Sequence, residues 1–244
     1  MPSATQRPLN LSMRRRRRMR KADINPDIEN LVQAFGVSRE TIGRLRIYQS
    51  LLEKWQSSIN LVGPATLHQF WTRHVADSAQ LVALAPPLAR RWVDLGSGGG
   101  FPGLVIALIW ASRPAADGGA VHLLESDGRK CEFLKTVIRE TGAPAVVHEG
   151  RIEEISQQNP DIFTEIDVIS ARALAPLDRL LLMSLPYFDI HTIGLFMKGR
   201  GWQEELTASE VSWNMDVEVV PSKTDEGAKI LICRQPELRQ SGLR

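Results

Sequence analysis

The segment from Val93 to Gly103 constrains the fold of this chain more than any other part of the sequence. It begins with the apolar run around Leu95, continues into Gly96-Ser97-Gly98-Gly99-Gly100 and leads into a second apolar run over residues 104–109. Glycines allow positive φ angles and close approach of a ligand to the backbone, and Pro102 suits a first helical turn. The segment therefore predicts a strand, a ligand-binding loop and a helix in immediate succession.

The sequence after residue 90 alternates short apolar runs with helical stretches. The runs predicted to be strands are residues 92–95, 121–125, 145–148, 166–170 and 194–197, and the clearest helical stretches between them cover residues 104–109 and 131–138. This alternation is typical of an α/β fold with a mostly parallel, doubly wound sheet. Two more runs, residues 215–220 and 228–233, predict a closing hairpin.

The sequence before residue 90 has a different, helical periodicity. Ser38 is a candidate N-cap for a long helix whose apolar residues recur every three or four positions up to Trp55. We therefore expect four parts: a disordered basic arm (1–26), a helical N-terminal cap (27–90), a ligand-binding α/β domain (91–235) and a short tail (236–244).

Charge and cysteine content narrow the function classes. Seven cations lie between Arg14 and Lys21 in a chain of net charge +2, which leaves −5 for the rest. Such a block is either a solvated tail or an arm that binds a polyanion. The two cysteines show no metal-binding spacing, and no apolar run approaches a membrane span. We expect a cytoplasmic protein without a metal site, and a monomer.

Two interpretations of the glycine loop compete. Gly98, Gly100 and Gly103 match a dinucleotide fingerprint, whereas the spacing from Gly96 to Gly100 matches the loop of S-adenosylmethionine-dependent methyltransferases. Asp94 favours the second interpretation, because a buried acid just before the loop would be costly in a dinucleotide strand. Glu125, at the end of the next strand, is placed to accept hydrogen bonds from ribose hydroxyls in either class of cofactor.

Several motifs together resemble the bacterial small-subunit ribosomal RNA guanine-N7 methyltransferases, also called the glucose-inhibited division protein B family. The resemblance runs from about Ile42 to Cys233, and the basic arm lies outside it. The matching residues are Trp55, Asn60-Leu61, Arg73 to Ser78, Asp94 to Gly103, Leu124-Glu125-Ser126, Lys130, Phe133-Leu134, Gly150 to Glu154, Ser170 to Ala173 and Lys198-Gly199.

The resemblance implies a Rossmann-like class I methyltransferase that methylates N7 of one guanine in 16S ribosomal RNA, as free RNA or in the 30S subunit. It implies that S-adenosylmethionine contacts Gly96 and Phe101, with Ile152 and Glu153 on its adenine side. It also places Arg172 beside the cofactor and the RNA. The expected cofactor-binding set is Asp94, Gly96, Gly98, Gly100, Phe101, Glu125, Ile152, Glu153 and Arg172.

The chemistry of N7 methylation requires alignment rather than proton transfer, because guanine N7 carries a free lone pair at neutral pH. No residue is therefore expected to act as a general base, and the candidates for orienting the RNA are Arg172, Lys198 and His74. Each also has a structural interpretation, as a salt bridge, a basic loop residue or a satisfied buried histidine. Two other functions stay open, a nicotinamide-dependent dehydrogenase and an RNA-binding protein without activity.

Overall fold

A computed structural model describes residues 26–112, 119–158 and 160–239 of the chain. The basic arm expected over residues 1–26 lies outside these ranges except for Pro26, and so does most of the expected tail. Within the described ranges, no helix is both long enough and apolar enough to cross a bilayer.

The first part of the described chain is helical, as predicted. Helix α1 covers Pro26–Phe35 and α2 covers Arg39–Gln56, with Ser38 as N-cap accepting from the backbone N–H of Thr41. The third helical segment of this part is not uniform. It starts as the 3-10 helix η2 (Pro64–Gln69), widens into the π-helix η3 (Phe70–Val75) and ends as α3 (Ala76–Val82). Single π turns often occur at functional sites.

The sheet has seven strands in the order β3-β2-β1-β4-β5-β7-β6. Strands β1 to β5 are parallel, and β7 pairs antiparallel with both β5 and β6, so the predicted hairpin is confirmed. Their bounds are β1 Arg91–Leu95, β2 Ala120–Glu125, β3 Ala145–Glu149, β4 Val168–Arg172, β5 Ile193–Lys198, β6 Trp213–Pro221 and β7 Lys229–Leu238. Strand β7 continues past the boundary expected at residue 235, because Leu238 still pairs with Trp213 of β6.

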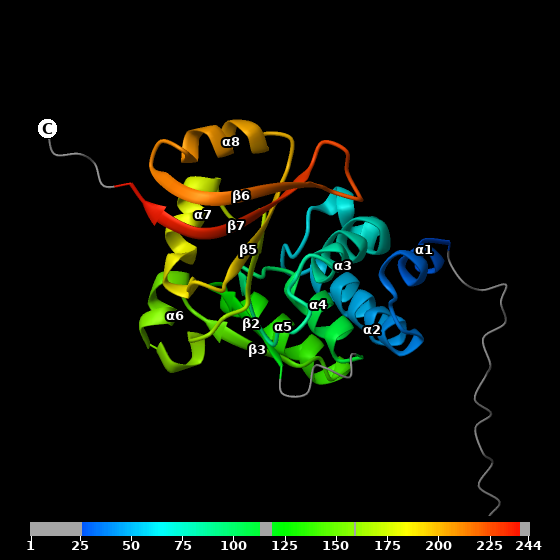
Figure 1. Cartoon of the computed structure of the whole chain (residues 1–244). Coiled ribbons are helices and arrows are strands. Elements are labelled where there is room, and N and C mark those ends of the chain that lie inside the picture. The colour runs from blue at the N-terminus through cyan, green and yellow to red at the C-terminus, as the bar shows by residue number, and fades with distance from the viewer. Residues whose placement is uncertain (1–25, 113–118, 159, 240–244) are drawn as a thin grey trace, which may run out of the picture.

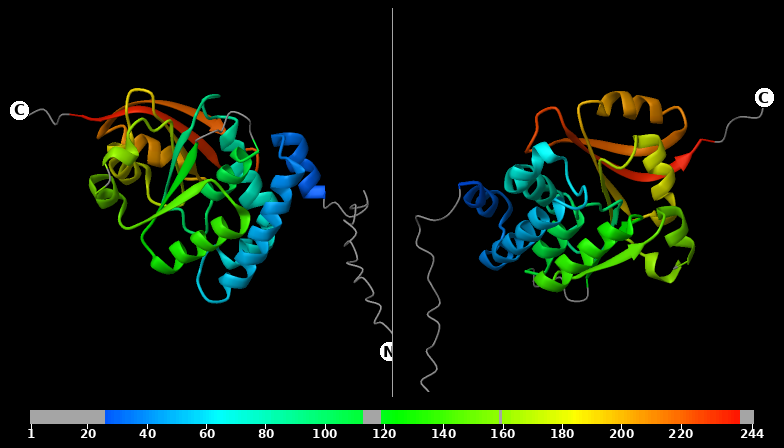
Figure 2. Two further views of the ribbon diagram at one scale, coloured as in Figure 1. Left: turned by 90° about the horizontal axis from the view of Figure 1, so that it is seen from below. Right: turned by 180° about the vertical axis from the view of Figure 1, so that it is seen from behind.

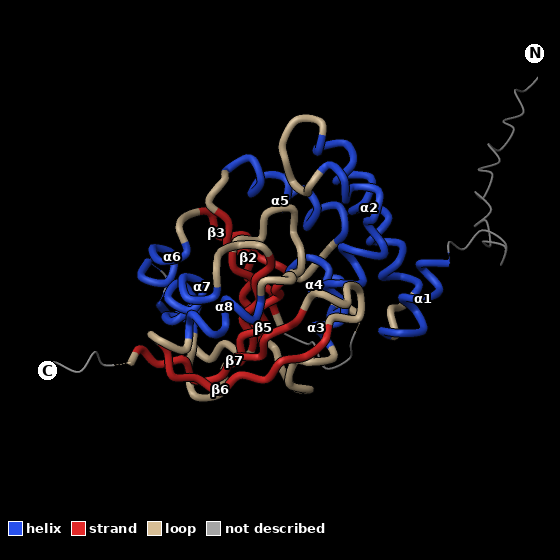
Figure 3. The backbone as a smooth tube through the Cα atoms, turned by 90° about the horizontal axis from the view of Figure 1, so that it is seen from above, coloured by secondary structure: helices blue, strands red, loops and turns tan. Residues whose placement is uncertain are grey.

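Helices cover both faces of this sheet (Figures 1 and 2). The helices after the first strand are α4 Gly103–Trp110, α5 Gly128–Thr141, α6 Ile152–Gln158, η5 Pro160–Phe163, α7 Leu177–Ser184, η6 Leu185–Tyr187 and α8 Trp202–Ser209. One apolar core joins the N-terminal helices, α4 and α5 to one face, and a second joins α6, α7 and α8 to the other. The view along the sheet in Figure 3 shows these two groups on opposite sides of the strands.

The N-terminal helices share the first core with the sheet and also reach the glycine loop. Tyr48 of α2 is fully buried, and its hydroxyl donates to the carbonyl of Gly99. Its ring stacks on Phe101 with centroids 5.2 Å apart. The helical part thus forms one wall of whatever the loop binds, at the carboxyl ends of the parallel strands where open α/β sheets hold ligands.

Candidate cofactor and substrate cleft

The described residues surround a cleft of about 850 Å³ at the carboxyl ends of β1, β2, β4 and β5. One end of the cleft is formed by the glycine loop, Glu125 and Ile152. The other end is formed by η2, η3, Arg172 and the loop between β6 and β7. Most of the residues that the sequence selected as site residues lie along this cleft.

The glycines of the loop have different tasks. Gly96 and Gly98 line the cleft with φ of +64° and +55°. A Cβ at Gly96 would lie 2.5 Å from Leu174 Cδ1, whereas a Cβ at Gly98 would have only the Gly96 carbonyl within 4 Å, at 3.8 Å. A Cβ at Gly100 would lie 2.6 Å from the Tyr48 hydroxyl. Gly98 therefore leaves space for a ligand, whereas Gly100 makes space for the packing of α2.

Asp94 is fully buried under the glycine loop, which it supports, and it does not line the cleft. Its Oδ1 accepts a hydrogen bond from Ser170 Oγ at 2.7 Å, and its Oδ2 accepts one from the Gly103 N–H at 3.2 Å. Complete burial raises the pKa of this carboxyl to about 6. Asp94, which the expected cofactor-binding set included, therefore supports the loop by fixing β4 and the start of α4 rather than by lining the cleft.

Gly103 makes the closest contact between helix α4 and the sheet. A Cβ at this position would lie 2.4 Å from Leu123 Cδ2 and 2.7 Å from Asp94 Oδ2. The glycine that completes the dinucleotide fingerprint is thus required for packing, whichever ligand the loop binds.

Glu125 ties the glycine loop to the loop after β2. Its Oε2 accepts from the Gly98 N–H at 2.8 Å, and its Oε1 accepts from the N–H groups of Ser126 and Asp127 at 2.8 and 2.9 Å. A carboxylate offers about four acceptor positions, so one is left for a ligand hydroxyl. The side chain is buried and lines the cleft, at the place that the sequence predicted.

Ile152 and Glu153 lie beside Glu125 at the start of α6, where the resemblance placed the adenine side of the cofactor. Ile152 is buried, and its carbonyl accepts from the Tyr187 hydroxyl at 2.5 Å. Glu153 is exposed at the rim of the cleft. An apolar wall with an acid at its edge suits a flat, polar-edged ring.

Phe101 lies at the junction of the two ends of the cleft. The His74 ring stacks on it with centroids 4.8 Å apart, and Arg172 Cζ lies 5.1 Å from its centroid. A guanidinium at this distance from an aromatic ring makes a favourable cation–π contact. Phe101 thus connects the glycine loop to the end of the cleft that contains Arg172, which we call the charged end.

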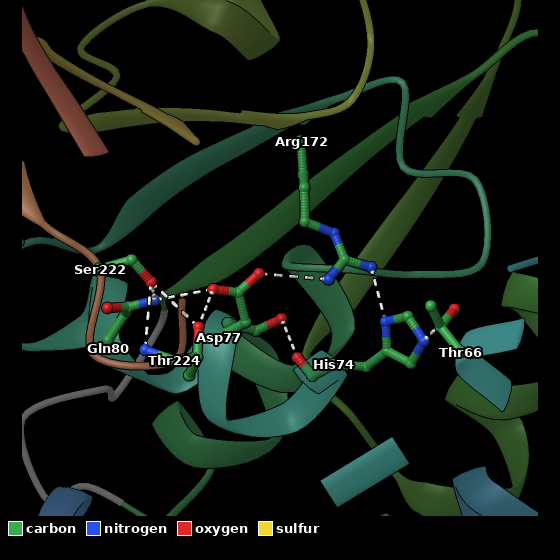
Figure 4. A network of polar contacts seen from close by, with 8 residues as sticks. Thr66, His74, Asp77, Gln80, Arg172, Ser222 and Thr224 are labelled. Atoms are coloured by element: carbon green, nitrogen blue, oxygen red, sulfur yellow. Dashed lines mark hydrogen bonds and ion pairs between the residues drawn. The ribbon is translucent and has the colours of Figure 1, made fainter. Parts of the chain in front are cut away.

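At the charged end of the cleft, seven polar residues form a set of contacts that we call the Arg172 network: Thr66, His74, Asp77, Gln80, Arg172, Ser222 and Thr224 (Figure 4). Arg172 Nη2 donates to His74 Nδ1 at 3.0 Å, and Nη1 lies 3.5 Å from Asp77 Oδ2. The network brings together η2, η3, α3, the end of β4 and the loop between β6 and β7.

The protonation of His74 follows from its partners. A guanidinium only donates hydrogen bonds, so the Nδ1 that it contacts must carry the lone pair. Nε2 then carries the proton and donates to Thr66 Oγ1 at 3.2 Å, and Thr66 in turn donates to the Gly63 carbonyl at 2.9 Å. Burial and the charge of Arg172 lower the pKa of His74 to about 4, which keeps the ring neutral near pH 7.

Asp77 lies four residues after Arg73, a spacing that on a helix favours a surface ion pair between the two. In the structure its carboxylate meets Arg172 instead, and its other oxygen accepts from Gln80 Nε2 at 2.8 Å and Thr224 Oγ1 at 2.7 Å. The surface ion pair with Arg73 is therefore not the interaction that holds Asp77. Gln80, Ser222 and Thr224 were missed by the sequence analysis, since no local pattern marks them.

Lys198 lies on the wall of the cleft, but its ammonium is held inside the protein. Nζ donates to the Ala175 carbonyl and to Glu205 Oε2, both at 2.7 Å, and the side chain is only 6% exposed. Of the three orienting candidates, Arg172 and His74 are in contact with each other and Lys198 is not part of their network. Among the described residues, no group of three or more His, Cys, Asp or Glu is arranged to hold a metal ion.

Comparison with known proteins adds family information to this geometry. The sequence profile of the family described as rRNA small subunit methyltransferase G matches residues 41–231. A protein of that name from Parvibaculum lavamentivorans is 53% identical over 208 residues, which cover 85% of this chain and 89% of that protein. One from Paramagnetospirillum magneticum is 50% identical over 207 residues, covering 85% and 95%.

Among solved structures, an O-methyltransferase from Bacillus cereus in complex with SAH superposes with a TM-score of 0.57 at 13% identity, covering 85% of this chain and 96% of that one. A putative O-methyltransferase from Klebsiella pneumoniae gives a TM-score of 0.54 at 16% identity, covering 85% and 95%. At such low identity these structures establish the fold alone, which is the class I methyltransferase fold that the sequence predicted.

Proposed function

The chain belongs to the rRNA small subunit methyltransferase G family, and we propose that it transfers the methyl group of S-adenosylmethionine to N7 of a guanine in 16S ribosomal RNA. The observation that carries this proposal is the arrangement of the cleft, with a glycine loop tied to Glu125 at one end and the Arg172 network at the other. The first end fits the methyl donor, and the second fits the RNA.

The residues at the first end fit S-adenosylmethionine. Gly98 leaves open the space that a side chain would fill, and Glu125 keeps an acceptor position beside it. The backbone of Gly96 and Gly98 would hold the methionine part, Glu125 the ribose, and Ile152 with Glu153 the adenine. When bound, the cofactor supplies an electrophilic methyl group on a sulfonium.

The chain's own residues act by orientation. Guanine N7 carries a free lone pair and needs no base, and both ring nitrogens of the neutral His74 are already hydrogen-bonded within the protein, Nδ1 to Arg172 and Nε2 to Thr66. Arg172 uses two of its five N–H groups toward His74 and Asp77. Arg172 lines the cleft, and its remaining donors would hold guanine O6 or a phosphate oxygen, so that N7 is presented to the methyl group.

The dehydrogenase interpretation of the loop is not favoured by the family to which the chain belongs. It makes a separate binding prediction, because a nicotinamide enzyme would bind NADH and not S-adenosylmethionine. Isothermal titration of the full-length protein with both compounds distinguishes the two. The family also disfavours the interpretation as an RNA-binding protein without activity.

The proposal is tested by methyl transfer in vitro. Purified protein is incubated with methyl-tritiated S-adenosylmethionine and either naked 16S rRNA or 30S subunits that lack the modification, with 23S rRNA as control. We expect label in one small-subunit substrate and none in 23S rRNA. Equal labelling of both RNAs, or label on an atom other than guanine N7, would contradict the proposal.

A further inference from the structure

The Arg172 network contains a charge arrangement that the proposed function does not by itself require. Arg172 brings a positive charge to a cleft that, if the proposed function holds, must accept a sulfonium cation. The purine also becomes positive as its N7 gains a methyl group. Like charges in a partly buried cleft repel more strongly than in water, because the effective dielectric constant is lower. A lone guanidinium would therefore oppose both the binding of the donor and the reaction.

Asp77 is placed to cancel this charge. Its Oδ2 lies 3.5 Å from Arg172 Nη1, and the two side chains are 18% and 19% exposed, so solvent screens the pair only weakly. The other hydrogen-bond partner of the guanidinium, His74, is neutral and cannot do the same. With Asp77 ionised the pair carries no net charge, while the free N–H groups of Arg172 still donate hydrogen bonds.

The carboxylate of Asp77 is held in place by residues distant in sequence. Thr224 Oγ1 donates to its Oδ1 at 2.7 Å, and Gln80 Nε2 donates to the same oxygen at 2.8 Å. Gln80 Oε1 in turn accepts from the Lys223 N–H at 2.9 Å, which anchors the loop between β6 and β7 to α3. Figure 4 shows Thr224 and Ser222 on the opposite side of Asp77 from Arg172.

We propose that Asp77 is the counter-ion that allows Arg172 to face a cationic methyl donor, and that Thr224 is a positioning residue that holds Asp77 from the loop between β6 and β7. The inference concerns the charge of the ligand and rests on the proposed function. It predicts that the network discriminates S-adenosylmethionine, which carries a sulfonium, from S-adenosylhomocysteine, which has the same shape without that charge.

The test measures dissociation constants of both compounds by isothermal titration with the full-length protein. In Asp77→Asn the unpaired guanidinium should raise the dissociation constant of S-adenosylmethionine about tenfold, equivalent to about 1.4 kcal/mol of binding free energy. The dissociation constant of S-adenosylhomocysteine should rise by less than about threefold, because this compound has no sulfonium charge for the guanidinium to repel. Asp161→Asn, which removes the same charge at an exposed position on η5 that does not line the cleft, is the control and should change neither constant.

The positioning residue is tested by a second pair of variants. Thr224→Val removes the hydroxyl with little change of shape and should shift the ratio of the two constants in the same direction, by a smaller factor. Thr224→Ser keeps the hydroxyl and should restore the wild-type ratio. Because Thr224 lies in a loop, these variants keep the proposal testable even if Asp77→Asn folds poorly.

A double variant separates the charge effect from general loss of structure. In Asp77→Asn/Arg172→Gln the unpaired positive charge is gone, so the ratio should return close to that of the wild type. Equal weakening of both compounds in Asp77→Asn, tighter binding of both, or an unchanged ratio would overturn the inference. Wild-type protein that binds neither compound would instead contradict the proposed function itself.

Discussion

Gly103 lies eight residues after Leu95, the last residue of β1, and Gly98 lies three residues after it. Substitutions at these two glycines perturb packing and ligand binding separately. Gly103 starts α4 against the sheet, and a Cβ there would lie 2.4 Å from Leu123 Cδ2 and 2.7 Å from Asp94 Oδ2. Gly98 faces the cleft, where a Cβ would meet open space. We therefore expect Gly103→Ala to impair stability and Gly98→Ala to impair binding.

The magnitudes follow from these contacts. At Gly103 the added methyl group overpacks a buried contact, which costs about 2–3 kcal/mol. For a chain of this size that lowers the Tm by about 4–12 °C. At Gly98 the φ of +55° makes alanine strained, at a cost of about 1 kcal/mol and about 2–4 °C in Tm. The same methyl group enters the space expected for the donor, so the Kd for S-adenosylmethionine should rise at least about tenfold, or about 1.4 kcal/mol.

Thermal unfolding and isothermal titration of the same preparations provide both measurements. Each variant is the control for the other, since both add one methyl group to the same loop region. A wild-type Tm for Gly103→Ala would refute the packing argument. Wild-type affinity in Gly98→Ala would refute the placement of the cofactor beside this loop.

Three further predictions concern charge. Glu125→Ala should weaken S-adenosylmethionine by about 1–2 kcal/mol in titration, whereas Glu149→Ala, at the paired end of β3, should not; equal effects would argue against a ribose contact. Burial lowers the pKa of His74 and of His122 from 6.5 to about 4. Below pH 6.5 the unfolded chain therefore binds protons at these histidines that the folded protein does not, so the stability present above pH 6.5 is lost as the pH falls toward 4. Urea unfolding should show this loss, less steeply in His122→Phe, and an equal slope would count against it. Deletion of residues 1–21 should reduce the salt dependence of RNA binding by about 0.7–0.9 per lost phosphate contact, and an unchanged slope would identify a solvated tail.

Much of the fold was predictable because its determinants are local. The strand-to-helix alternation, the hairpin and the N-cap at Ser38 each depend on residues within a few positions of one another. The same holds for the end of the cleft that contains Gly98 and Glu125, since parallel strands bring their carboxyl ends to one edge. Family resemblance added Ile152 and Glu153 to that end.

The other end of the cleft was only partly predictable. Arg172 and His74 were selected one by one, but their contact joins residues 98 positions apart. Thr224 meets Asp77 across 147 positions, in a loop with no motif. Lys198 is the opposite case. Its sequence context indicated a basic residue available to RNA, whereas in the structure its buried ammonium is bonded to Glu205. Such contacts depend on packing that periodicity and spacing do not encode.

The central claim is most directly tested by mapping 16S rRNA from a strain that lacks this protein. Ribonuclease fragments from the deletion strain and its parent are compared by mass spectrometry, and N7-methylguanine is located by borohydride treatment and aniline cleavage. We predict that one guanine loses 14 mass units (about one CH₂ group) and its aniline-sensitive site, and that both return when the wild-type gene, but not a Gly98→Val variant, is supplied. Identical fragments in the two strains, or a loss at an atom other than N7, would contradict the account.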